Sequence, residues 1–231
     1  MSLKKELEDQ VWDFVNLKWD EREGRQVPDD TSVTFKNEAV KINATVLYAD
    51  MADSTFLVDN YEPWFAAEVY KSFLFCAAKI IRANNGALTA YDGDRVMAVF
   101  MGDKKNTDAV KASMKINWSV GQIIRPSISK KYPANKFNLR HVVGIDTSPL
   151  YVAKTGVRGA NDLVWVGRAA NHAAKMAALP EDYQTYISES VYKVMADEAK
   201  FSNGKNMWRT YEWNEFDGRT IYCSTYRWCI D

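Results

Sequence analysis

Long apolar runs, a signal segment and an excess of either charge are all missing from this sequence. No window approaches 18 uncharged apolar residues, and residues 1–8 lack the apolar core of a secretory signal. The 30 basic and 30 acidic side chains cancel, so no overall field attracts nucleic acid or an anionic membrane. These absences predict a cytoplasmic protein with no nucleic-acid partner and no membrane contact.

Cysteine and histidine are also scarce. The three cysteines, Cys76, Cys223 and Cys229, lie in apolar or strand-like surroundings without the spacing of a metal site, so we expect reduced thiols. The two histidines, His141 and His172, lie far apart and join no pattern of zinc ligands or of a catalytic triad. A Gly-x-x-x-x-Gly-Lys loop is absent too, which excludes a P-loop nucleotidase.

The sequence does contain two aspartates at the ends of strand-like segments. Residues 44–49 are apolar apart from Thr45, which predicts a strand buried on both faces with Asp50 at its carboxyl end. Asp94 lies in a Gly-Asp turn between two β-prone segments, which is typical of a tight hairpin. If this hairpin lies beside the first strand, the two carboxylates converge. Paired carboxylates of this kind suit divalent cations bound to a triphosphate.

These stretches resemble the class III nucleotidyl cyclases, the family of adenylate and guanylate cyclases. Residues 48–55, with Tyr-Ala-Asp-Met at their start, match its first motif, and residues 93–100, Gly-Asp-Arg-Val-Met-Ala-Val-Phe, match its hairpin. Val-Gly-Ile-Asp-Thr at 143–147 and Gly-Arg-Ala-Ala-Asn-His-Ala-Ala-Lys at 167–175 match its third block. The motifs follow the family's order across residues 40–228, which implies an α+β, ferredoxin-like cyclase catalytic domain.

The chain is expected to have two parts. Residues 1–39 would form an amphipathic N-terminal helix over residues 3–23 and a linker, and residues 40–231 would form the cyclase catalytic domain. Such a helix usually covers its own core, and a dimer contact is the alternative.

Two proline positions shape the elements expected inside the domain. A helix over residues 106–124 should end at Arg125-Pro126. Strands over residues 138–146 and 150–154 should be separated by a turn that contains Ser148-Pro149.

The resemblance implies roles for the central site residues. Asp50 and Asp94, with the backbone carbonyl of Met51, would hold two divalent cations, Mn²⁺ or Mg²⁺. Asn171 and Lys175 would orient the ribose and stabilise the transition state, and their spacing of four places both on one face of a helix. The family's arginine is a lysine here, which keeps the charge but loses the bidentate fork.

The triphosphate is expected to contact the loop after the first strand and a basic residue of the tail. The phosphate-binding candidates are Asp53, Ser54, Thr55 and Arg219. Arg219 lies where some family members carry a phosphate-binding lysine. Because Ser148-Pro149 replaces the family's Gly-Arg, Lys154 or Arg158 is another source of charge.

The informative departures from the family concern the base. Purine cyclases carry Lys or Glu three residues before the hairpin glycine, and Asp, Thr or Cys three residues before the glycine of the asparagine helix. Those positions hold Ala90 and Val164, which cannot hydrogen-bond through their side chains. Tyr48 replaces the usual Phe, and Tyr91 lies inside the hairpin motif. We therefore expect a base pocket of these four residues that favours a single-ring base.

This combination resembles the bacterial pyrimidine cyclases of the Pycsar anti-phage system. The resemblance implies a homodimer with shared active sites that converts UTP to 3′,5′-cyclic UMP and pyrophosphate, a messenger read by a separate effector protein. The alternatives are a cytidylate cyclase, a purine (adenylate) cyclase and an inactive cyclase-like module that only binds nucleotide.

Overall fold

The computed structural model describes residues 2–157 and 159–230. The helical elements are α1 (Leu3–Asn16), α2 (Ser54–Asn60), α3 (Pro63–Ala83), α4 (Lys105–Ser119), the π-helical η1 (Val120–Ile124), α5 (Arg125–Lys131), α6 (Arg168–Ala177), α7 (Glu189–Val194), α8 (Asp197–Lys200) and the 3-10 turn η2 (Asn214–Phe216). The strands are β1 (Asp20–Glu23), β2 (Glu38–Ala52), β3 (Ala87–Asp92), β4 (Arg95–Phe100), β5 (Arg140–Val157), β6 (Ala160–Val166), β7 (Thr185–Ser188), β8 (Phe201–Ser202), β9 (Lys205–Asn206), β10 (Arg209–Trp213) and β11 (Arg219–Ser224).

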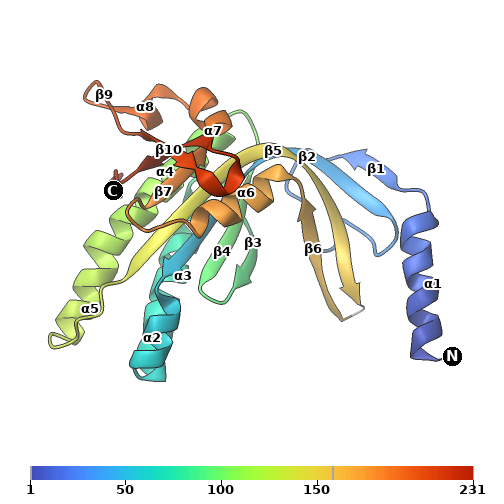
Figure 1. Cartoon of the computed structure of the whole chain (residues 1–231), viewed down its shortest axis with the longest axis horizontal. Helices are drawn as coiled ribbons and strands as arrows, with labels where there is room; N and C mark the ends of the chain where they lie inside the picture. The colour runs from blue at the N-terminus through green and yellow to red at the C-terminus, as the bar shows by residue number, and fades with distance from the viewer. Residues whose placement is uncertain (1, 158, 231) are drawn as a thin grey trace.

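In the described part of the chain, nine strands form one mixed sheet (Figure 1). The order is β10-β11-β7-β5-β2-β4-β3, with β1 added beside β2 and β6 beside β5. The β1–β2 and β5–β7 pairs are parallel and the other pairs of this sheet are antiparallel. The expected α+β architecture is confirmed. None of the described helices is both long enough and apolar enough to cross a bilayer.

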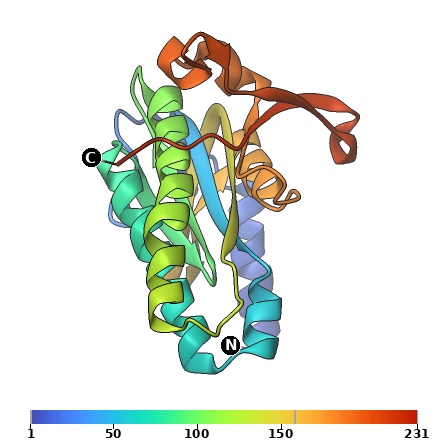
Figure 2. The same ribbon diagram turned by 90° about the vertical axis from the view of Figure 1, so that its left-hand side faces the viewer.

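Strand β2 lies at the centre and buries both of its faces. Leu47 and Ala49 belong to the core beneath α3 and α4, whereas Ala44 and Val46 belong to the core beneath α6. Figure 2 shows α3 and α4 on one side of the sheet and α6 on the other. Because side chains alternate along a strand, one apolar run serves both cores. The predicted two-sided burial of residues 44–49 is confirmed.

A close contact between β5 and α6 sets the position of that helix. A Cβ atom added to Gly144 of β5 would lie 2.1 Å from the backbone oxygen of Ala173 and 2.6 Å from the nitrogen of Ala177. The helix can approach the strand this closely only because residue 144 has no side chain. The same helix carries Asn171 and Lys175, so this contact fixes the position of both residues relative to the sheet.

The N-terminal helix is shorter than the predicted span of residues 3–23. Helix α1 ends at Asn16, and residues 20–23 form β1, which pairs in parallel with the start of β2. Strand β4 covers β2 only from Thr45 to Asp50, which leaves the edge at residues 38–41 for β1. Backbone pairing with this edge outweighs the local helical pattern, because an open strand edge offers hydrogen bonds to the chain.

The structure also places α1 relative to the expected core. None of its residues is buried, and in Figure 1 it stands at the far end of the molecule beyond β6. The amide of Asn37 donates to the backbone oxygens of Phe14 and Leu17 at 3.0 and 2.8 Å, which ties down the end of the helix. Strand β1 makes the N-terminal segment part of the nine-stranded sheet.

The predicted helix stop at Arg125-Pro126 is wrong. The chain continues from α4 through the π-helical η1 into α5, as the long helical rod of Figure 2 shows. Pro126 lies in the first turn of α5. The missing amide of a proline costs little there, since the wider π turn already interrupts the regular hydrogen-bond ladder.

The predicted break at Ser148-Pro149 is also wrong. Strand β5 runs without interruption from Arg140 to Val157, because β2 pairs with it on one side over residues 140–153. On the other side, β7 pairs with residues 143–145 and β6 with residues 151–157. Pro149 lies in the gap between these two partners, where its missing N–H breaks no ladder.

The three cysteines are free thiols. Cys223 is buried and Cys76 is half-buried, and burial raises the pKa of both thiols, that of Cys223 to about 11. Cys229 is exposed. The buried thiols therefore behave as small apolar side chains of the core.

Replacing Gly144 should disrupt the contact between β5 and α6. We expect Gly144→Ala to lower the free energy of unfolding by about 3 kcal/mol, because the added methyl group collides with backbone atoms that cannot rotate away. Gly121→Ala is the matched control, since its added methyl group meets only the flexible end of Arg227. Urea unfolding followed by circular dichroism measures both variants, and equal stability of the two would contradict this account of α6.

Candidate active site

Two rows of side chains cross the sheet near the carboxyl end of β2. In the first row, Met97 of β4 pairs with Tyr48 of β2 and with Ala90 of β3. Directly paired residues of antiparallel strands point to the same face of a sheet. This face is the α6 face, because Met97 and Tyr48 pack in the core beneath that helix. The row is therefore apolar except for the hydroxyl group of Tyr48.

The second row carries charge. Arg95 pairs with Asp50 of β2 and with Asp92 of β3. Its Nε atom lies 3.7 Å from Asp50 Oδ2 and 4.0 Å from Asp92 Oδ2. That nitrogen is buried and forms no hydrogen bond within the described residues. One guanidinium therefore lies between two carboxylates, and its Nε forms a hydrogen bond with neither.

Burial destabilises the charged form of the Asp50 carboxyl group. Its side chain is 15% exposed, and burial raises its pKa to about 6. The Arg95 charge opposes this shift, and the neighbouring charge of Asp94 adds to it. Asp94 is thus within electrostatic range, so the structure brings together the two aspartates that the sequence singled out.

The donors at this end of β2 fit a divalent cation. The two carboxylates and the backbone carbonyl of Met51 are hard oxygen ligands of the kind that Mg²⁺ and Mn²⁺ prefer. A cation would also relieve the repulsion between Asp50 and Asp94. The described residues contain no group of three or more acidic, histidine or cysteine side chains that could hold a metal unaided. Further ligands would have to come from a triphosphate and water.

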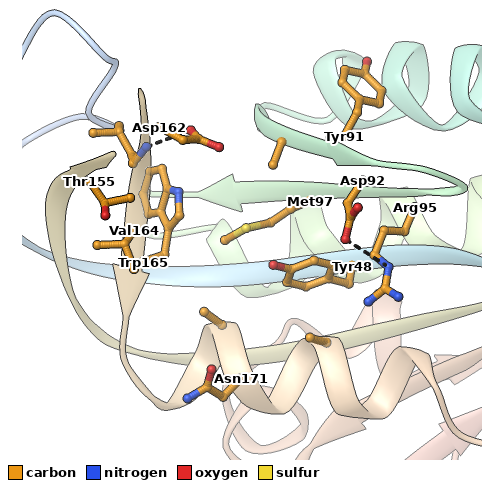
Figure 3. A pocket seen from close by; sticks show the side chains of 14 residues that line it. Tyr48, Tyr91, Asp92, Arg95, Met97, Thr155, Asp162, Val164, Trp165 and Asn171 are labelled. Atoms are coloured by element: carbon orange, nitrogen blue, oxygen red, sulfur yellow. Dashed lines mark hydrogen bonds and ion pairs between the residues drawn. The ribbon is translucent and has the colours of Figure 1, made fainter. Parts of the chain in front are cut away.

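A cavity of about 580 Å³ opens over the apolar row (Figure 3). It lies between the β3–β4 hairpin, the β5–β6 hairpin and α6. The lining residues are Tyr48, Ala90, Tyr91, Asp92, Arg95, Met97, Thr155, Asp162, Leu163, Val164, Trp165, Ala170, Asn171 and Ala174. The four predicted base-pocket residues and Asn171 therefore line one cavity.

The two tyrosines differ in position. Tyr48 is half-buried, and burial raises the pKa of its hydroxyl. Tyr91 is 56% exposed, and in Figure 3 its ring points away from Tyr48. Tyr48 narrows the cavity, whereas Tyr91 lies at its rim. Ala90 and Val164 add no side-chain hydrogen-bonding group to the wall.

Four polar residues of the wall were not among the predicted site residues. Arg95, Asp92, Thr155 and Asp162 all line the cavity. A signal for Arg95 exists in the sequence, because residues two apart on a strand share a face and Arg95 is two positions from Met97. Thr155 and Asp162 belong to a hairpin whose register only the folded chain defines, since Thr155 pairs with Asp162.

Lys175 and Arg219 lie outside the cavity lining but close to each other. Burial lowers the pKa of His172, and the positive charges of Arg168, Arg219 and Lys175 lower it further against the effect of Asp146. These three cations therefore lie within electrostatic range of His172. Lys175 Nζ lies 5.4 Å from the centre of the Phe216 ring, in the turn before Arg219.

The loop after β2 carries the other phosphate-binding candidates. Asp53 has a left-handed backbone, with φ of 59°, and its carboxylate pairs with Arg140. Ser54 and Thr55 form the first turn of α2 and are at least partly exposed. This segment thus presents the hydroxyl groups of Ser54 and Thr55, whereas the charge of Asp53 is neutralised by Arg140.

Lys154 is engaged elsewhere. Its ammonium group donates to the backbone oxygen of Asp30 at 2.5 Å and lies 5.0 Å from the ring centre of Phe35. Both partners belong to the segment before β2, away from the aspartate pair. The other candidate, Arg158, lies outside the described residues.

Known proteins are similar to this chain in fold and in sequence. Residues 37–209 match the family described as the adenylate and guanylate cyclase catalytic domain. Across its whole length the chain is 59% identical to the entire uridylate cyclase of Xanthomonas perforans and 46% identical to that of Burkholderia cepacia. The structure of a bacterial light-regulated adenylyl cyclase superposes with a TM-score of 0.67 at 19% identity, over 80% of this chain and 90% of the other. This structural likeness shows the fold alone.

Removing the charge of Asp50 should stabilise the protein without metal. We expect Asp50→Asn to raise the Tm by about 2–4 °C in a chelating buffer, because a buried carboxylate next to Asp94 is exchanged for a neutral group of the same shape. With Mn²⁺ and a nucleoside triphosphate, the wild-type Tm should rise and that of the variant should not. Thermal unfolding with and without Mn²⁺ and nucleotide tests both statements. A variant that gains as much as wild type would remove Asp50 from the metal site.

Proposed function

The chain belongs to the adenylate and guanylate cyclase catalytic domain family, and from this premise we propose that it converts UTP to 3′,5′-cyclic UMP and pyrophosphate. The names of the two full-length relatives support UTP as the substrate. The observation that carries the proposal is the cavity over the apolar row, which reaches Arg95 and Asp92 of the charged row and is lined by Ala90 and Val164.

The wall of the cavity disfavours a purine. Ala90 and Val164 leave the polar edge of adenine or guanine without a side-chain partner, at a cost of about 1–3 kcal/mol for each unpaired group. The ring of Tyr48 limits the depth available to a second ring. A single-ring base needs fewer partners and less room.

The charged row favours uracil over cytosine. Uracil presents one carbonyl oxygen, O4, where cytosine presents an amino group, and the guanidinium of Arg95 can only donate. Arg95 lines the cavity, so the exposed part of its guanidinium suits a carbonyl acceptor. The carboxylate of Asp92, on the same row, suits the N3–H of uracil. Cytosine would set a donor against a donor.

The reaction joins the ribose 3′-oxygen to the α-phosphorus and breaks the bond between that phosphorus and the oxygen of the leaving pyrophosphate, while the 3′-hydroxyl proton passes to solvent. Asp50, Asp94 and the Met51 carbonyl would hold two divalent cations, Mn²⁺ or Mg²⁺, which neutralise the triphosphate and lower the pKa of the 3′-hydroxyl. Positioning and charge neutralisation carry such a reaction without a protein nucleophile.

Other residues of the chain bind and orient the substrate. Asn171 orients the ribose from the edge of the cavity, and Lys175 offsets the charge that grows at the α-phosphate. Arg219 and the hydroxyls of Ser54 and Thr55 bind the outer phosphates. Asp53 supports this loop through its pair with Arg140 rather than through a phosphate contact.

We further propose a head-to-tail homodimer with two shared sites. The predicted site residues of one chain fall into separate groups, because Lys175 and Arg219 do not line the cavity that borders Asp50. A second copy turned by a two-fold axis could bring the α6 face of one chain to the aspartate pair of the other. The product would be read by a separate effector protein in anti-phage defence, in the cytoplasm.

Presenting each of the four nucleoside triphosphates with Mn²⁺ tests the substrate. We expect cyclic UMP as the main product, because Arg95 and the apolar wall favour uracil. Asp94→Ala should reduce turnover by about 10³-fold or more, since the cation site loses a ligand. Chromatography and mass spectrometry identify the products, and circular dichroism confirms that the variant is folded. Cyclic AMP as the main product would overturn the base assignment.

Mixing two inactive variants tests the shared site. In an Asp50→Ala and Lys175→Ala mixture, half of the randomly formed dimers are mixed, and each mixed dimer has one intact site of two. We therefore expect about a quarter of wild-type turnover to return after subunit exchange. Each variant alone is the control. No recovery in a mixture that has been shown to contain mixed dimers would place each site within one chain.

A further inference from the structure

Beneath α6 lies a charged group that the proposed mechanism does not use. Asp146 of β5 is fully buried, and its Oδ1 accepts hydrogen bonds from the Thr147 backbone N–H at 2.8 Å and from Arg168 Nη2 at 3.2 Å. Its Oδ2 accepts no hydrogen bond within the described residues and lies 3.3 Å from His172 Nδ1. Burying a carboxylate oxygen without a hydrogen bond costs free energy of folding, so the contact between Oδ2 and His172 is important for stability.

Arg168 connects the start of α6 to the middle of β5. Besides Asp146, its Nη2 donates to the backbone oxygen of Thr147 at 2.7 Å and to Ser190 Oγ at 3.3 Å. The Ala169 N–H donates to Ser148 Oγ at 2.9 Å. The first turn of the helix is therefore held even if the contact to His172 is lost.

His172 connects α6 to the hairpin that carries Arg219. Its ring lies edge-on to Trp213 and Phe216, with centroids 5.4 and 5.2 Å away. Phe216 lies beneath the ammonium group of Lys175. One imidazole thus contacts Asp146 on one edge and, on the other side, the aromatic pair that supports Lys175 and precedes Arg219.

We propose that Asp146 and His172 form a positioning pair that holds Lys175 of α6 and Arg219 of the β10–β11 hairpin at the spacing the phosphates require. The carboxylate also offsets the repulsion among Arg168, Lys175 and Arg219 before an anionic substrate arrives. Neither residue touches the substrate. The inference rests on the proposed cyclase activity, and it identifies the residues that position Lys175 and Arg219.

Two substitutions of His172 separate the polar contact from ring packing. His172→Phe keeps a ring against Trp213 and Phe216 but removes the nitrogen that lies 3.3 Å from Asp146 Oδ2. His172→Asn keeps an N–H donor near the position of Nδ1 but removes the ring. We expect His172→Phe to lower kcat for UTP by about 10- to 100-fold with KM changed by less than about threefold, and His172→Asn to recover most of kcat.

Asp146→Asn is the second test, in case His172→Phe does not fold. The amide keeps an acceptor for Arg168 and Thr147 and turns its N–H₂ toward His172, so we expect the same loss of kcat with KM little changed. Ser190→Ala is the matched control, because it removes a hydrogen bond of Arg168 without touching the pair, and its kcat should stay within about twofold of wild type.

The outcomes separate this inference from the proposed function. Rates are measured well below each variant's Tm and expressed per folded protein. Wild-type kcat in Asp146→Asn, or a loss in His172→Asn that His172→Phe does not share, would overturn the positioning pair and leave ring packing as the role of His172. Absence of cyclic UMP from the wild-type protein would instead overturn the proposed function.

Discussion

The pairing of β2 with β4 is the constraint on which the whole site depends. It sets Tyr48 opposite Met97 and Asp50 opposite Arg95, and so creates an apolar row and a charged row side by side on one face. A slip of one residue would send both rows to the opposite face, beneath α3 and α4. The apolar residues that alternate along β2 fix this register, because each set fits only its own core.

Charge is arranged around this register in two opposed groups. The aspartate pair lies at the carboxyl end of β2, whereas Lys175 and Arg219 lie within electrostatic range of His172. Each group strains the isolated chain through repulsion between like charges. Divalent cations would relieve the first and a triphosphate the second, so the energy of binding substrate goes partly into relieving strain already present.

Selection of the base depends as much on missing groups as on present ones. In the proposed function, alanine and valine at positions 90 and 164 offer a purine no side-chain hydrogen bond, and the phenol at position 48 forms part of the wall. Arg95 and Asp92 are two of the polar residues that remain in the wall, and they already neutralise one another in part. A base that satisfies both replaces a long ion pair with hydrogen bonds, which gives a small ring enough binding energy.

The sequence by itself determined the local features. The two-sided burial of residues 44–49, the hairpin at Asp94 and the α+β architecture follow from apolar patterns and turn residues, and the three motifs indicated the family. The tertiary structure decided what depends on neighbours distant in the sequence. It made residues 20–23 a strand on the open edge of β2, let β5 and the α4–α5 rod pass through their prolines, and set Arg95 in the cavity wall and Asp146 beneath His172. These features depend on which strand edge is free and which side chains meet across the sheet, and a linear pattern does not contain that information.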